Sequence, residues 1–64
     1  MNKNIKINIS NKIAEITLNR PERMNAITID LLQELKDELI NINSNNSISV
    51  IILSGAGKAF SAGV

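Results

Sequence analysis

The chain begins with a strict alternation of apolar and polar residues. Isoleucines occupy positions 5, 7 and 9, and polar residues separate them. After the segment 10–12, which contains Asn11, apolar residues again occupy alternate positions, at 14, 16 and 18. A period of two residues is typical of a half-buried β-strand. Because asparagine tolerates the positive φ that tight hairpins require, we predict an antiparallel hairpin here.

The alternation stops at Pro21, and a helical pattern follows it. Pro21 lacks an N–H group and favours extended backbone at Arg20, which indicates a loop. Thr28 can then cap a helix. Apolar residues recur at spacings of three and four and predict one apolar face: Leu32, Leu35, Leu39 and Ile42. We therefore predict an amphipathic helix over residues 28–42, with Glu34 and Glu38 solvated off this face.

A third strand is predicted after the helix, at residues 49–54. Its sequence, Ser-Val-Ile-Ile-Leu-Ser, is apolar on both faces, as parallel strands of layered α/β folds are. The order of elements is therefore strand, strand, helix, strand. The helix face and both faces of this strand need further layers to cover them. We interpret the chain as an incomplete domain.

Composition narrows the possible classes of protein. The chain has 64 residues, a net charge of +1, and neither cysteine nor histidine. A chain this short buries only about 60% of its unfolded surface, and here no disulfide can compensate. The balanced charge predicts no nucleic-acid partner, and the absence of a long apolar run predicts no membrane partner. No secretory signal is visible, so we expect a cytoplasmic protein.

Glycines after the third strand raise two alternatives for a nucleotide site. The dinucleotide motif would need a glycine where Phe60 stands. A P-loop would need a hydroxyl residue after Gly57-Lys58, and Ala59 stands there. From the residues alone, a surface turn is the better interpretation of this segment.

Three polar residues could carry chemistry. Ser61 would need a base to act as a nucleophile, and the chain has no histidine, so a small residue tolerated in a close-packed loop is the better interpretation. Arg20 and Arg23 flank Pro21 and could contact phosphate groups, although a solvated pair is favoured by the residues alone.

Two stretches together resemble the signatures of one enzyme family. They are Ile16-Thr17-Leu18-Asn19-Arg20-Pro21-Glu22-Arg23-Met24-Asn25-Ala26-Ile27 and Gly57-Lys58-Ala59-Phe60-Ser61-Ala62-Gly63-Val64. The family is the enoyl-CoA hydratase/isomerase, or crotonase, family. The resemblance implies an α/β, crotonase-like spiral of strand-strand-helix units. Residues 1–64 would form the N-terminal part of one incomplete domain, with the first turn of the spiral and the start of the second.

The resemblance also implies an activity on acyl-CoA thioesters, most often the addition of water to a 2-enoyl-CoA. Members polarise the thioester carbonyl with two backbone N–H groups, and Val64, after Gly63, aligns with one of them. A fixed donor of this kind is worth about 2.7–4 kcal/mol in the transition state. The second donor and the acid/base carboxylates would lie beyond position 64. Isomerisation, thioester hydrolysis and decarboxylation therefore stay open, and the chain alone is expected to be inactive.

The remaining implied residues bind the substrate. Arg23, Met24 and Ala26 align with the loop that holds the phosphates and adenine of CoA, and Ala62 with a backbone contact to adenine. Lys58 would also approach the nucleotide. No permanent cofactor is implied, since CoA arrives as part of the substrate, and the full-length protein would form a homotrimer or hexamer. The alternative is a non-catalytic module that presents the helix 28–42 to a partner.

Overall fold

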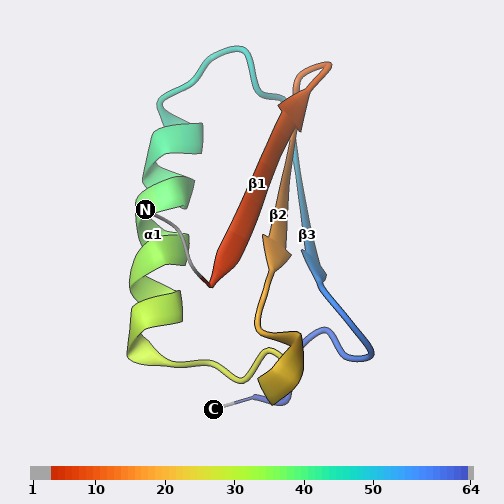
Figure 1. Cartoon of the computed structure of the whole chain (residues 1–64). Helices are drawn as coiled ribbons and strands as arrows, with labels where there is room; N and C mark the ends of the chain where they lie inside the picture. Colours follow the sequence, from red (N-terminus) through yellow and green to blue (C-terminus); the bar gives the residue numbers. More distant parts are fainter. Residues whose placement is uncertain (1–3, 64) are drawn as a thin grey trace.

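The computed structural model describes residues 4–63, which form a sheet with a helix along one of its faces (Figure 1). The elements are β1 (Ile5–Ser10), β2 (Ile13–Leu18), the short 3-10 helix η1 (Pro21–Arg23), α1 (Ile29–Asn43) and β3 (Val50–Gly55). The strand order is β1-β2-β3, with β1 antiparallel and β3 parallel to β2. The predicted α/β class and the order of its elements are confirmed.

A two-residue turn joins β1 to β2. Both turn residues have positive φ, 51° at Asn11 and 68° at Lys12. This conformation matches the right-handed twist of paired strands, which is why such turns dominate tight hairpins. The predicted antiparallel hairpin is confirmed, and Ile5 lies opposite Leu18 in its register.

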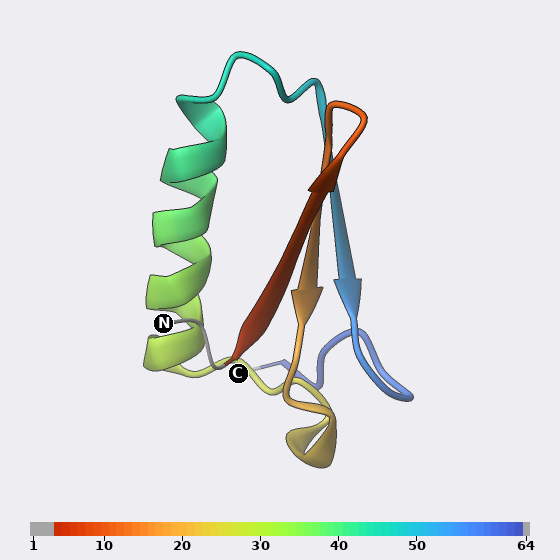
Figure 2. The same cartoon turned by 45° about the horizontal axis from the view of Figure 1, so that its top comes forward.

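The core lies between α1 and the sheet (Figure 2). Residues that lie opposite each other in neighbouring strands share one face of a sheet, and that face supplies most of the core. The buried apolar residues are Ile5, Ala14, Ile16 and Leu18 from the sheet and Leu31 and Ile42 from the helix. A single helix therefore covers β1 and β2.

The helix begins as predicted. Thr28 has extended backbone, and its side chain accepts a hydrogen bond of 3.1 Å from the backbone N–H of Leu31. Asp30 lies in the first turn, where its negative charge interacts favourably with the positive end of the helix dipole.

The apolar face of α1 is only partly buried against the sheet. Leu31 is fully buried, whereas Leu32 and Leu39 are 49% and 40% exposed. Successive helical residues are rotated by about 100°, so a helix that turns Leu31 and Ile42 to the sheet places Leu32 and Leu39 on its flank. Of the predicted apolar face, Ile42 is buried and Leu35 packs against the core. Leu32 and Leu39 stay exposed, in keeping with the prediction that this face needs a further layer.

The expectation that Glu34 is solvated is also wrong. Its side chain is half-buried and accepts hydrogen bonds from Asn4, from the backbone N–H at 3.0 Å and from the side-chain amide. Glu38 is half-buried as well. Glu34 thus ties the start of β1 to the helix that covers it.

The third strand is only partly covered. It pairs with β2 along one side, and its apolar residues, Val50 to Leu53, are each 44–49% exposed. A groove between this strand and the flank of α1 is lined by Lys36, Leu39, Ile40, Asn43 and Ile51. The strand is parallel and apolar on both faces, as predicted, and the described residues supply no second layer over it.

Candidate functional site

Two loops meet at the carboxyl ends of β2 and β3. The first loop (residues 19–28, including η1) follows β2, and the second loop (residues 56–63) follows β3; both lie at the lower end of Figure 1. Because the two strands are parallel, their chains leave the sheet at the same edge. In open α/β sheets this edge is where ligands bind.

Backbone hydrogen bonds join the two loops. The N–H of Ala62 donates to the carbonyl of Met24 at 2.8 Å, and the N–H of Ile27 donates to the carbonyl of Gly63 at 2.9 Å. The two stretches that carry the sequence signatures are therefore neighbours in space. A single ligand can contact both.

Asn25 is the buried residue at this junction. It is fully buried and has a φ of 56°, a conformation that asparagine adopts more readily than most residues. Its Nδ2 donates to the carbonyls of Ala56 and Ala59, each at 2.8 Å, and its Oδ1 accepts from the N–H of Arg20 at 2.6 Å. The sequence interpretation assigned no role to Asn25. Its residue type suits a positive φ, but its partners in the second loop could not be read from the sequence.

Ser61 and Arg20 are also part of this network. The hydroxyl of Ser61 donates to the carbonyl of Asn25 at 2.8 Å and accepts from the N–H of Gly63 at 3.0 Å. Arg20 Nη1 donates to Thr28 Oγ1 at 3.1 Å. Ser61 is thus more than a tolerated small residue, and the solvated-pair interpretation is wrong for Arg20, which is half-buried.

The second loop folds back tightly over the end of β3. A Cβ atom on Gly55 would lie 2.5 Å from the carbonyl oxygen of Phe60 and 2.8 Å from that of Ala59. Gly57 has a φ of 83°, and a Cβ there would lie 2.9 Å from Cβ of Pro21. Gly55 has no room for a side chain against this backbone, and the positive φ of Gly57 favours glycine there as well. The segment is a close-packed loop rather than a simple surface turn.

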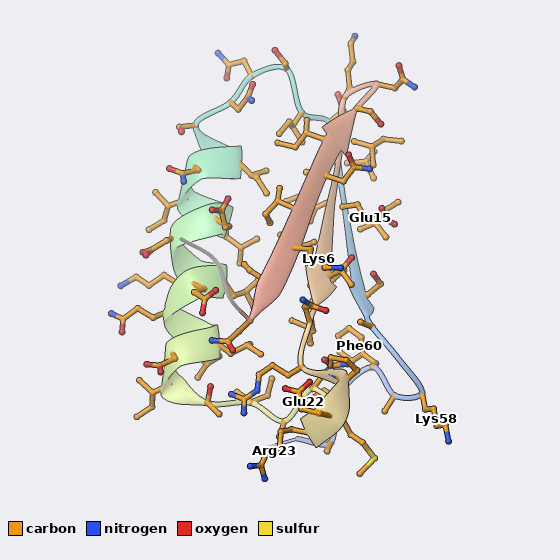
Figure 3. All side chains as sticks on the ribbon, in the orientation of Figure 1. Lys6, Glu15, Glu22, Arg23, Lys58 and Phe60 are labelled. Atoms are coloured by element: carbon orange, nitrogen blue, oxygen red, sulfur yellow. The ribbon has the colours of Figure 1, made fainter. Side chains whose placement is uncertain are left out.

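The predicted binding residues are spread over this end of the molecule. Met24 and Ala62 are exposed, and Ala26 is half-buried. Arg23 and Lys58 are both exposed, but their side chains point in different directions (Figure 3), so the structure does not bring these two cations together.

The predicted catalytic segment ends at the edge of what the structure describes. Gly63 is exposed, has a φ of 93°, and has open space within 4 Å of its Cβ position. Val64 lies outside the described residues.

Residues 4–63 hold neither a metal-binding cluster nor a membrane-spanning helix. No group of three or more His, Cys, Asp or Glu side chains there is arranged to hold a metal ion. No helix in that range is both long and apolar enough to cross a membrane.

Residues 8–64 match the model of the family described as enoyl-CoA hydratase/isomerase. The chain belongs to this family. This match confirms the resemblance carried by the two signatures.

Individual relatives agree in fold and differ in the reaction named for them. A probable enoyl-CoA hydratase of Mycobacterium bovis is 50% identical over 52 residues, which are 81% of this chain and 18% of that protein. An enoyl-CoA hydratase structure from Mycobacterium marinum has a TM-score of 0.93 at 32% identity, covering 97% of this chain and 29% of that one. A monofunctional enoyl-CoA isomerase from M. smegmatis has a TM-score of 0.91 at 40% identity, covering 97% and 30%.

These likenesses confirm that the described elements are the first turn of a crotonase-like fold. The chain spans about a fifth of the length of the curated relatives it matches, 18% for the M. bovis protein. The family members similar to it include a hydratase and an isomerase, so the family does not by itself fix the reaction.

Proposed function

We propose that residues 1–64 are the N-terminal part of a single crotonase-like domain, in an enzyme that adds water to a 2-enoyl-CoA thioester. The observation that carries this proposal is the fixed end of the second loop. Gly63 donates its N–H to Ser61 Oγ at 3.0 Å, and its carbonyl accepts from Ile27 at 2.9 Å. These two bonds hold the backbone of Gly63 at the junction of the two loops.

The backbone N–H of Val64, the residue after Gly63, is the proposed oxyanion donor. Negative charge builds up on the thioester oxygen as the enolate forms. A donor that is already oriented stabilises this charge without reorganising, and is worth about 2.7–4 kcal/mol. The residue type supports the proposal, since glycine carries no side chain to keep a thioester from the backbone.

The proposed CoA site lies where the loops run side by side. Met24 and Ala62 are joined by a backbone hydrogen bond of 2.8 Å, so contacts from Met24, Ala26 and Ala62 could fall on one nucleotide. Arg23 is exposed at the end of η1 and would supply the positive charge for a CoA phosphate. Lys58, which points elsewhere, has a weaker claim to such a contact.

Hydration is proposed over the other family reactions because the M. bovis relative, at 50% identity, is named as a probable hydratase. Double-bond isomerisation, thioester hydrolysis and decarboxylation are the alternatives. The test is product analysis with the full-length enzyme and a 2-enoyl-CoA in H₂¹⁸O. A 3-hydroxyacyl-CoA that carries the label is expected. A shifted double bond, or release of free CoA, without labelled hydroxyacyl product would contradict hydration.

The donor role of Val64 is tested by changing one backbone atom. Replacing the Val64 amide by an ester in the semisynthetic full-length enzyme removes the N–H, and should lower kcat by about 10²–10³. Val64→Ala keeps the donor and serves as the control, with kcat within about tenfold of the unchanged enzyme. Near-normal kcat in the folded ester variant would exclude the donor role.

A further inference from the structure

Asn25 holds both ends of the second loop. In the part of the chain that the structure describes, it is the fully buried polar residue. Its side chain binds the start of the loop, at the carbonyls of Ala56 and Ala59. Its backbone carbonyl binds the end of the loop through Ser61, whose hydroxyl also accepts from the N–H of Gly63.

We propose that Asn25 is a positioning residue, which orients the second loop so that the peptide after Gly63 can polarise a thioester carbonyl. This inference rests on the proposed oxyanion function. Asn25 itself need not touch the substrate, because it is fully buried. It acts through the loop backbone, whose position it fixes by three hydrogen bonds, two from its side chain and one to its carbonyl.

The two ends of the Asn25 amide have different tasks. Oδ1 accepts within the first loop, from Arg20, whereas Nδ2 donates only across to the second loop. Asn25→Asp separates these tasks, because a carboxyl group of the same size keeps the acceptor. An ionised carboxylate has no donor and a protonated one has a single donor, so at least one bond to the second loop is lost in either form.

The experiment compares Asn25→Asp with Asn11→Asp in the full-length enzyme. Asn11 makes a matched control, because it is exposed, has a similar φ of 51°, and lies in the hairpin turn away from both loops. Four quantities are measured: the unfolding midpoint, the Kd for CoA, kcat per folded enzyme, and the infrared band of a ¹³C-labelled thioester carbonyl in a bound saturated acyl-CoA.

For Asn25→Asp we expect a folded enzyme with a Kd for CoA within about threefold of the original. Its kcat should fall by about tenfold or more, equal to about 1.4 kcal/mol or more of activation free energy. On binding to this variant, the thioester carbonyl band should shift to lower frequency by less than it does on binding to the unchanged enzyme. Asn11→Asp should match the unchanged enzyme in all four quantities.

A purely structural role predicts another result. Turnover would then fall only with the folded fraction, and the carbonyl band of bound ligand would keep its full shift; this result would overturn the inference. If Asn25→Asp does not fold, Ser61→Ala takes its place, because it cuts the link to Gly63 without burying a charge. It should reduce the band shift and lower kcat by about threefold or more; an unchanged band would overturn the inference. No band shift in the unchanged enzyme would overturn the proposed oxyanion function as well.

Discussion

The junction of the two loops and the strand β3 differ in how complete their interactions are within residues 4–63. At the junction, Asn25 is fully buried and bonded, and no buried side-chain nitrogen or oxygen in residues 4–63 lacks a hydrogen-bond partner. At β3, four successive apolar side chains are 44–49% exposed. The two loops therefore find their hydrogen-bond partners within this chain, whereas the apolar faces of β3 still need a covering layer.

The difference follows from the forces involved. A buried polar group needs only one partner within hydrogen-bond distance, so two neighbouring loops can pair all of their buried polar groups with each other. Burial of a sheet face requires a whole layer of side chains, and α1 covers only β1 and β2. The relatives are several times longer than this chain, which leaves room for such layers.

The largest effect is expected when the chain is studied alone. The isolated 64-residue chain should lack a cooperative monomeric fold and be largely unfolded or self-associated, because the exposed faces of β3 have no cover. Circular dichroism melting, combined with analytical ultracentrifugation, measures this. A monomer that melts cooperatively would show that the sheet is complete without further layers.

A smaller effect is expected when β2 and β3 are compared by the stability cost of an alanine substitution in the full-length enzyme. Ile16 is fully buried, and Leu53 lies directly opposite it on β3 but is 44% exposed here. If other parts of the enzyme cover β3, Ile16→Ala and Leu53→Ala should both cost about 2–5 kcal/mol of unfolding free energy. Denaturant titration of the two variants measures these costs. A cost for Leu53→Ala below about 0.5 kcal/mol, the usual value for surface positions, would mean that this face stays open to solvent.

The smallest effect is expected on substrate binding at the junction of the two loops. Arg23→Ala in the full-length enzyme should raise KM for a CoA thioester by about tenfold, equal to about 1.4 kcal/mol, and leave kcat nearly unchanged. The charge would bind the ground state and the transition state alike, so only substrate binding should suffer. Lys6→Ala, an equal loss of charge at an exposed position on β1, is the control in the same steady-state assay. Equal KM values for the two variants would remove Arg23 from the proposed site.

The sequence by itself determined the local features of this protein. The alternation of apolar residues predicts the hairpin, the Thr28 cap predicts the start of α1, and the doubly apolar segment predicts a parallel strand, because each of these signals depends on neighbouring residues. The two signatures likewise indicated the family, which the match over residues 8–64 confirms.

Only the tertiary structure decided the contacts between distant residues. It rotated α1 so that Leu31 rather than Leu32 meets the sheet, and it paired Glu34 with Asn4. It also placed the Asn25 amide between two carbonyls that are 31 and 34 residues further along the chain. A local pattern specifies which residues can be buried or hydrogen-bonded. Their partners depend on how separate elements dock, and that is decided by the whole arrangement of helix, sheet and loops.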